Sequence, residues 1–179
     1  VKAPGGTFML GFLLDSRTGL GYHRDFKISN FDWVNRVIDW LTKFSVQEIL
    51  DLPDSIERTV RYQEMYKEGE RFYQKNSELD GNVIVTDIRD KKIPLTNRFL
   101  IYSLPELEKG NISVRLANGK VGEFNTISVA HSIFVKTSKV HSGKLCRQYG
   151  GGGHSGAGTC QPSIEDTDKI FQEIIDACK

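Results

Sequence analysis

The apolar positions of this chain follow two kinds of pattern, and the pattern changes near residue 80. Residues 31–44 and 54–78 repeat apolar side chains every three or four positions, which predicts helices with one buried face. Four later segments are rich in β-branched and aromatic residues, which predicts strands. These segments are 82–88, 98–104, 111–117 and 124–135.

The N-terminal part carries a further strand signal. A glycine turn at Gly5–Gly6 precedes the apolar run Phe8–Leu14, which predicts a buried strand that ends at Asp15. Asn30 is expected to cap the helix that follows it. The buried face of that helix would comprise Phe31, Val34, Val37, Ile38 and Leu41.

The C-terminal part alternates between helix and strand signals. Residues 142–149 predict a short helix capped by Ser142, and residues 157–161 predict a last strand. Residues 163–178 place their apolar side chains on one side of a final helix. The predicted fold class is therefore α/β, with helices packed on a mixed sheet.

Composition narrows the class of protein. The chain has 179 residues, of which 39% are hydrophobic and 26% charged, which is typical of a globular domain rather than a membrane protein. Its three cysteines, Cys146, Cys160 and Cys178, are odd in number and irregularly spaced. They argue against a disulfide framework and favour a reducing, cytoplasmic setting. The first residue is Val1 rather than methionine, which suggests a piece of a longer protein.

One long segment contains no carboxylate. Residues 124–164 hold no Asp or Glu, although the overall acidic content predicts about five in 41 residues. The same segment carries Lys136, Lys139, Lys144, Arg147, His131, His141 and His154. Because a nearby carboxylate repels an anion, this distribution favours a binding site for a phosphorylated ligand. A chance gap over buried strands is the alternative interpretation.

Four glycines and a histidine, Gly150–His154, lie inside this segment. Successive backbone N–H groups without side chains can converge on an anion, and a histidine beside them can donate a further hydrogen bond. The motif is neither a P-loop nor a dinucleotide fingerprint, because the required Lys-Ser/Thr and G-x-G-x-x-G spacings are missing. A flexible surface loop is the alternative interpretation.

Two other chemistries are compatible with these residue types. His141, Cys146, His154 and Cys160 are potential zinc ligands, but no C-x-x-C or H-x-x-H pair supports them. Cys160 could act as a nucleophile with His154 as its base, although a buried cysteine in a strand is the more common case.

Three segments together resemble the DHH phosphoesterase superfamily. They are "GFLLDSRTGLGYHRDFKISN", "VAHSIFVKTSKVHSGKLCRQ" and "YGGGGHSGAGTCQ". The resemblance is to the exopolyphosphatase-related proteins and to their nanoRNase and pAp-phosphatase relatives. It implies a catalytic domain that binds two divalent metals, usually manganese, through Asp and His residues of motifs such as Asp-His-His. It also implies a C-terminal DHH-associated domain that presents a glycine-rich loop to the substrate.

The resemblance assigns roles to individual residues. The substrate-binding loop would comprise Gly151, Gly152, Gly153 and His154. Arg115 matches a strand arginine that contacts substrate phosphate, and Asp15 matches a metal-binding aspartate of the fourth catalytic motif. Without the resemblance, Arg115 would be interpreted as a solvated strand-end arginine and Asp15 as a loop cap.

The sequence also departs from the family pattern. It contains no Asp-His-His and no D-x-D first motif, and one carboxylate cannot hold two metal ions. Residues 1–50 are therefore expected to be the end of a catalytic domain, 51–80 a linker helix and 81–179 the DHH-associated domain. On its own, the chain is not expected to hydrolyse a substrate.

The expected function follows from the resemblance. The chain would be the C-terminal part of a metal-dependent phosphoesterase that acts on short oligonucleotides, nucleoside bisphosphates or polyphosphate. Its partner would be a phosphorylated small molecule or a short single-stranded nucleic acid, with no membrane involved and a homodimer left open. The alternatives are a stand-alone module that binds single-stranded nucleic acid or nucleotides, as in alanyl-tRNA synthetases, and a purely structural domain.

Overall fold

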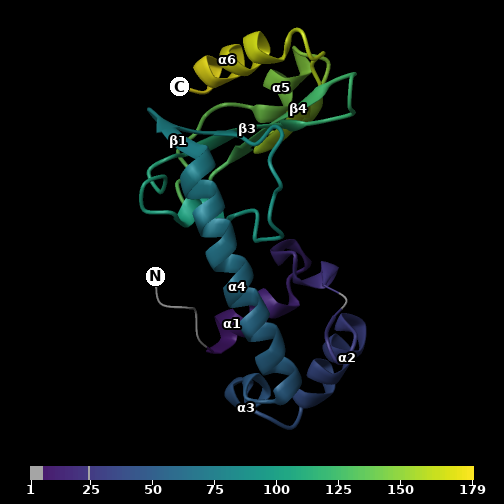
Figure 1. Cartoon of the computed structure of the whole chain (residues 1–179). Coiled ribbons are helices and arrows are strands. Elements are labelled where there is room, and N and C mark those ends of the chain that lie inside the picture. Colours follow the sequence, from purple (N-terminus) through teal and green to yellow (C-terminus); the bar gives the residue numbers. More distant parts are fainter. Residues whose placement is uncertain (1–5, 24) are drawn as a thin grey trace. The chain divides into compact units, whose positions relative to one another are not determined.

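The computed structural model describes residues 6–23 and 25–179, which divide into two compact units. Unit 1 comprises the chain up to Glu70 together with Pro94–Leu100, and unit 2 comprises Arg71–Ile93 and Ile101–Lys179. The long helix α4 contributes to both units, as the ribbon view shows (Figure 1). The predicted domain limits at residues 50 and 80 stay a prediction.

Unit 1 is built from helices. Their bounds are α1 Gly6–Leu14, η1 Ser16–Thr18, η2 Leu20–Tyr22, α2 Asn30–Trp40, α3 Val46–Leu50 and α4 Pro53–Asn76. Ser29 caps α2 by accepting a hydrogen bond from the N–H of Asp32, so the expected cap at Asn30 is wrong by one residue. Ser45 and Glu48 form a reciprocal capping box at α3.

The predicted strand at Phe8–Leu14 is wrong, because this segment is helix α1. Met9, Leu10 and Leu13 are buried, and their spacing is that of one helix face. A short, uniformly apolar run carries no periodicity that separates a strand from a helix. Gly6 begins the helix, whereas Gly5 of the predicted turn lies outside the described residues.

The buried face of α2 also differs from the prediction. Trp33 and Val37 are buried, whereas Phe31, Ile38 and Leu41 are exposed. The buried indole lies against the guanidinium of Arg58, a charged residue that a search for apolar periodicity does not select.

Arg58 of α4 is fully buried in unit 1. Its guanidinium lies 4.3 Å from the ring centre of Phe26 and 4.9 Å from that of Trp33. It donates hydrogen bonds to Asn30 Oδ1 and to the carbonyl oxygens of Ile28 and Asp54. Burial lowers the pKa of this guanidinium, and the hydrogen bonds and the two aromatic faces offset the cost of its desolvation.

Unit 2 contains one six-stranded mixed sheet with the order β1-β2-β3-β4-β6-β5. Its elements are β1 Ser77–Asp80, β2 Val83–Asp87, η3 Leu100–Ser103, β3 Ile112–Asn118, β4 Asn125–His131, α5 Ser142–Arg147, β5 Gly152–His154, β6 Ala157–Cys160 and α6 Thr167–Cys178. Only β2 and β3 are parallel, and every other neighbouring pair is antiparallel.

Several sequence expectations for unit 2 need correction. Residues 98–104 form η3 and turns rather than a strand, and Tyr102 in this segment is buried. The short strands β1 and β5 were not predicted, and β4 ends at His131. His141, not Ser142, caps α5, with its Nδ1 accepting a hydrogen bond from Lys144 N.

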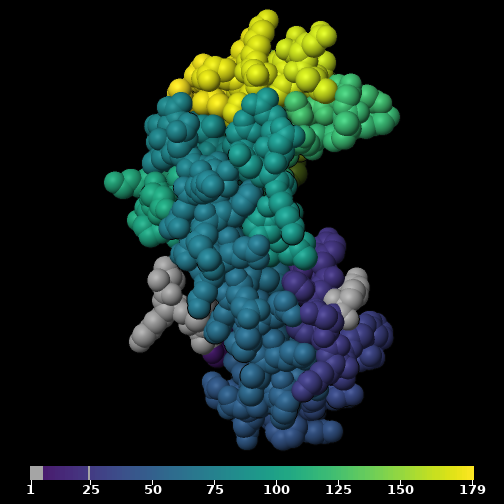
Figure 2. Space-filling view, in the orientation of Figure 1, coloured from purple at the N-terminus to yellow at the C-terminus, as the bar shows by residue number. Residues whose placement is uncertain are grey.

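The two faces of the sheet have different chemistry. Helices α5 and α6 cover one face, which contributes buried residues such as Val114 and Ile127 to the core (Figure 1). The outer surface of α6 is visible in yellow in the space-filling view (Figure 2). We call the opposite side the polar face, because Thr86, Arg115 and Ser128 pair across neighbouring strands and point to it. Among the described residues, no helix is long and apolar enough to cross a membrane.

Replacing Arg58 with alanine is expected to destabilise unit 1 by about 3 kcal/mol, because the change removes a fully buried side chain and leaves the partly buried carbonyls of Ile28 and Asp54 without this donor. Urea unfolding followed by tryptophan fluorescence would report it, since Trp33 and Trp40 both lie in unit 1. Arg36→Ala is the matched control, because its side chain is 51% exposed and its ion pair to Asp54 is long, at 3.5 Å. Equal stability of the two variants would contradict this account.

Candidate anion-binding site

The predicted glycine loop is an edge strand. Gly152–His154 form β5, which pairs with β6 through a tight turn at Ser155–Gly156. Helix α5 lies against this β5–β6 hairpin, and the N–H of Ser142 donates to the carbonyl of Ser155 at 3.0 Å. The segment is therefore held on both sides, and the interpretation as a flexible loop is not supported.

The first two glycines of the run have local structural causes. Gly150 adopts a φ of 75°, and its N–H donates to the carbonyl of Arg147. The N–H of Gly151 donates to the carbonyl of Cys146, so together the two glycines end α5 in a Schellman motif. A Cβ on Gly151 would also lie 2.6 Å from Cys160 Cα. These two N–H groups are used within the chain and do not form the expected anion nest.

Gly153 also has a structural cause. Its φ of 145° is unfavourable for residues with side chains, and a Cβ there would clash with the carbonyl oxygen of Ala157. On the facing elements, a Cβ on Gly158 would lie 2.6 Å from the carbonyl oxygen of Ser142, and one on Gly143 would clash with Gly153. Close backbone contact between α5 and the hairpin thus requires glycine at several positions.

Gly152 is different. A Cβ at this position would meet no atom within 4 Å, and its φ lies outside the region that favours glycine. Gly152 pairs with Thr159, and Thr159 pairs with Ser128, so all three point to the polar face. Neither backbone conformation nor packing within the chain accounts for glycine here.

His154 lies two residues beyond Gly152 and therefore on the same face. Its side chain is exposed, and its Nδ1 accepts a hydrogen bond from the N–H of Gly156 at 3.3 Å. A neutral imidazole that accepts at Nδ1 carries its proton at Nε2. His154 therefore has a donor available for an anion at the edge of the sheet.

Arg115 also points to the polar face, in register with Thr86, Ser128, Thr159 and Gly152. Its side chain is half-buried and forms a hydrogen bond with Tyr73. Burial raises the pKa of the Tyr73 hydroxyl, and the nearby guanidinium of Arg115 acts in the opposite direction. Three strand spacings, about 14 Å in a flat sheet, separate its backbone from that of Gly152. Arg115 and the hairpin would thus contact different parts of one ligand rather than a single phosphate.

Ser128 and Thr159 belong to the same surface, although no motif of the sequence marks them. They lie on the polar face between Arg115 and Gly152. Alternation of apolar and polar residues along β4 could have identified Ser128, because Ile127 and Val129 on either side of it are buried. No strand residue that points to the polar face is acidic, so this surface is compatible with an anion.

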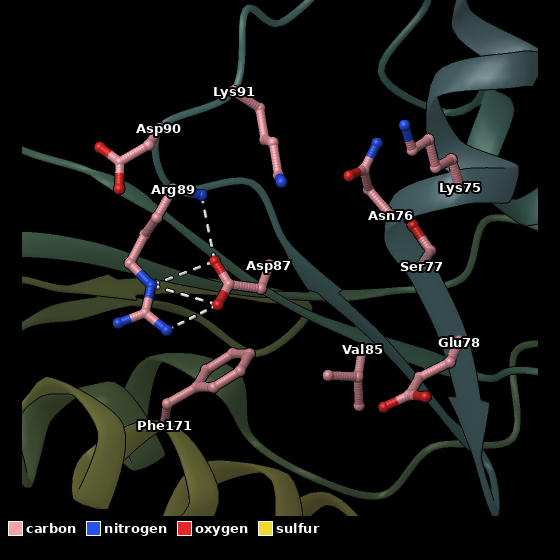
Figure 3. A pocket seen from close by; sticks show the side chains of 10 residues that line it. All are labelled: Lys75, Asn76, Ser77, Glu78, Val85, Asp87, Arg89, Asp90, Lys91 and Phe171. Carbon is pink, nitrogen blue, oxygen red and sulfur yellow. Dashed lines mark hydrogen bonds and ion pairs between the residues drawn. The ribbon is translucent and has the colours of Figure 1, made fainter.

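A hollow of about 600 Å³ lies elsewhere in unit 2, along β1 and β2 (Figure 3). Three acidic residues, Glu78, Asp87 and Asp90, line it together with three cations, Lys75, Arg89 and Lys91, so its lining has no excess of positive charge. The guanidinium of Arg89 is turned to the Asp87 carboxylate and also bonds to Asp168 on α6, and both interactions raise its pKa. Arg89 therefore fastens α6 to the sheet rather than offering a free cation.

Asp15 lies in unit 1, where its carboxylate is held by Arg17. It accepts hydrogen bonds from the backbone N–H, Nε and Nη2 of Arg17, and these bonds hold its pKa below the usual range. Among the described residues, no group of three or more His, Cys, Asp or Glu side chains could hold a metal ion. The described part of the chain thus does not fit a two-metal centre, and Asp15 as a ligand stays a prediction.

The zinc and nucleophile interpretations are not supported within the described residues. Cys146 and Cys160 are buried in the core under the hairpin, and His141 serves as the cap of α5. A hydrogen bond with Cys146 and burial both raise the pKa of Cys160 far above that of a free thiol. A thiol in this state is a poor nucleophile.

Comparison with solved structures gives a strong match. No protein-family model and no curated protein sequence matches the chain. The pGpG-specific phosphodiesterase PggH from Vibrio cholerae, a DHH-family enzyme, matches with a TM-score of 0.89 and 36% identity over 99% of this chain. The predicted resemblance to DHH phosphoesterases is confirmed. So is the fold class, an α/β structure with a DHH-associated mixed sheet and packed helices.

The chain spans 59% of the length of that phosphodiesterase. An exopolyphosphatase-related protein from Bacteroides fragilis is more distant, with a TM-score of 0.48 and 17% identity over 83% of this chain and 45% of that one. The C-Ala domain of Aquifex aeolicus alanyl-tRNA synthetase has a TM-score of 0.34 and 18% identity over 55% of this chain and 96% of that one.

Alanine substitutions at two glycines distinguish a glycine that the packing of the fold requires from one that it does not. Gly158→Ala is expected to lower the free energy of unfolding by about 1–3 kcal/mol, because its Cβ would lie 2.6 Å from the carbonyl oxygen of Ser142. Gly152→Ala should change it by less than about 1 kcal/mol. Urea unfolding followed by circular dichroism measures both. Equal destabilisation would show that the space beside Gly152 is needed by the fold itself.

Proposed function

We propose that unit 2 binds the phosphate group of a nucleotide-like ester on its polar face, beside Gly152 and His154, as part of a DHH-type phosphoesterase. The observation that carries the proposal is the missing side chain at Gly152, which internal packing does not explain. A ligand that approaches the backbone closely would explain it. The similarity to a phosphodiesterase supports a hydrolase role of this kind.

Each group on this face has a distinct task in the proposal. Nε2–H of His154 donates a hydrogen bond to a phosphate oxygen, and the open space at Gly152 lets the ligand lie against the strand. The guanidinium of Arg115 contacts a second anionic part of the ligand across the sheet. Together these groups would hold and orient a short phosphate ester, so that its reacting bond is presented in one position.

Hydrolysis itself needs groups that the described residues do not bring together. In DHH enzymes two divalent metal ions supply the chemistry that activates water and polarises the phosphate ester. We propose that the metal ions, manganese being the expected species, are held mainly by residues outside this sequence. The 59% coverage of the related phosphodiesterase is compatible with that proposal.

Short oligonucleotides are the substrate class that we favour over polyphosphate and nucleoside bisphosphates. The related enzyme is specific for pGpG, which is a 5′-phosphorylated dinucleotide. The separation between Arg115 and Gly152 would suit a ligand with more than one phosphate. Single-stranded nucleic acid bound without catalysis is the alternative function.

His154→Ala and Gly152→Ala are each expected to weaken binding of a 5′-phosphorylated dinucleotide to the 179-residue chain by about 10- to 100-fold. The first variant removes a donor to a charged oxygen, and the second places a methyl group where the ligand lies. Isothermal titration calorimetry would measure the affinities. Lys169→Ala is the control, because it removes an exposed positive charge from α6 on the opposite side of the sheet.

Unchanged affinity in both site variants would refute the proposed site. The salt dependence of binding separates the two functions. A short ligand that contacts one or two phosphates gives a shallow slope, whereas a binding module for long single strands gives a steep one.

The chain alone, supplied with manganese, is expected to show no turnover of pGpG or pAp above the buffer rate, because its described residues form no metal-binding cluster. Product formation followed by chromatography tests this expectation. Turnover that a chelator abolishes would mean that the chain carries a complete metal centre.

A further inference from the structure

A second surface feature of unit 2 lies near the same polar face. A hollow of about 550 Å³ is lined by Tyr102, Ser103, Glu108, Lys109, Phe134 and Val135. Its residues come from η3, from the turns before β3 and from the segment after β4. None of them belongs to the glycine motif or to the phosphate contacts proposed above.

Phe134 is the most unusual residue of this hollow. It is 63% exposed, although a phenylalanine of this size is normally buried. Its exposure does not come from a loose segment, because the buried hydroxyl of Ser132 accepts hydrogen bonds from the N–H groups of Phe134 and Val135. The N–H of Ser132 in turn donates to the carbonyl of Asn111 at 2.9 Å.

A second hydrogen bond fixes the far side of the same segment. The side-chain amide of Asn111 donates to Thr137 Oγ1 at 3.0 Å. The aromatic ring is thus presented to solvent from a segment fastened to the start of β3. Because the backbone that carries the ring is already held in place, a ligand that stacks on it would not have to order this segment.

The charges around the ring indicate the kind of ligand. Lys136 and Lys139 are exposed beside Phe134 in the sequence, and Lys109 lines the hollow itself. Aromatic side chains interleaved with lysines are typical of surfaces that bind single-stranded nucleic acid, where bases stack on the rings and cations attract the backbone. A docking surface for an apolar protein segment would instead show a contiguous apolar patch.

Glu108 indicates which part of a nucleotide the hollow would hold. Its carboxylate lines the hollow and would repel a phosphate, but it can accept a hydrogen bond from a ring N–H or amino group. The hollow is therefore suited to the base of a nucleotide, whereas the phosphate is better placed on the carboxylate-free polar face.

The hollow and the polar face are linked through Tyr102. Its hydroxyl bonds to Ser113 Oγ at 2.7 Å and donates to the carbonyl of Ala130 at 3.1 Å. Ala130 pairs with Ala157, which pairs with His154. Two strand spacings, about 10 Å, thus separate Ala130 from His154. Tyr102, which lines the hollow and contacts Ala130, therefore lies within reach of a dinucleotide whose phosphate is near His154.

We propose that Phe134 and the hollow beside it form a nucleobase subsite, in which a base of the ligand stacks on the Phe134 ring while its phosphate lies near His154. This inference rests on the proposed function, because it extends the same bound ligand across the sheet. It makes Phe134 a specificity residue for ligands that carry a base.

The test compares two ligands on the full 179-residue chain. One is a 5′-phosphorylated dinucleotide that carries the fluorescent base 2-aminopurine, tested at each position in turn, and the other is ribose 5-phosphate, which has no base. Phe134→Ala is expected to weaken dinucleotide binding by about 5- to 100-fold, the range of one base–aromatic stack. Its affinity for ribose 5-phosphate should stay unchanged.

Phe134→Trp keeps a stacking surface and should retain dinucleotide binding, with quenched 2-aminopurine fluorescence. Phe134→Leu keeps the apolar bulk and should lose most of the stacking. Phe31→Ala is the matched control, because it removes another largely exposed ring, from α2 of unit 1.

The possible results separate the two proposals. If Phe134→Ala binds the dinucleotide as tightly as the unchanged chain does, while His154→Ala does not, the base subsite is wrong and the phosphate site stands. If Phe134→Ala weakens both ligands equally, the ring supports the fold or the phosphate site and the subsite is again refuted. If the unchanged chain binds neither ligand, the proposed function fails and this inference fails with it.

Discussion

The structure of unit 2 depends on the close packing of helix α5 against the β5–β6 hairpin. Glycine at 143, 153 and 158 lets the helix backbone and the strand backbones approach to distances at which a methyl group would collide with a carbonyl. This contact holds the edge of the sheet next to the core that contains Cys146 and Cys160. The position of His154 follows from it, because His154 is the last residue of β5.

This constraint changes how the glycine run is interpreted. Gly150 and Gly151 end α5, and Gly153 has a φ of 145° together with a steric requirement. A run of four glycines therefore does not by itself indicate an anion nest, since three of them have causes inside the fold. Only Gly152 lacks such a cause, and it lies on the face that carries Arg115, Ser128 and Thr159. Within the glycine run, the indication of a ligand thus reduces to Gly152, a single position with open space.

The sequence predicted the centre of the sheet and the long helices well, because alternation in β3 and β4 and helical periodicity in α4 and α6 reflect burial on one side. Predictions from the sequence were wrong where tertiary contacts determine the local structure. The run Phe8–Leu14 has no periodicity and forms a helix, and Trp33 is buried in the core of unit 1 with the guanidinium of Arg58 against it. No sequence pattern marks Phe134 as exposed. Its segment is held where it is by the hydrogen bond that Phe134 N–H donates to Ser132 and by the bond from Asn111 to Thr137.

In the proposed function, binding and metal chemistry are separated for an electrostatic reason. Carboxylates that hold divalent metal ions also repel the phosphate groups of a substrate wherever the metal does not neutralise them. A surface that holds the remote part of the substrate is therefore more effective when it carries donors and cations alone. No strand residue of the polar face is acidic, and in the proposed arrangement the carboxylate of Glu108 lies beside the uncharged base. Binding energy gathered there can position a reacting bond elsewhere without disturbing the charges of the metal centre.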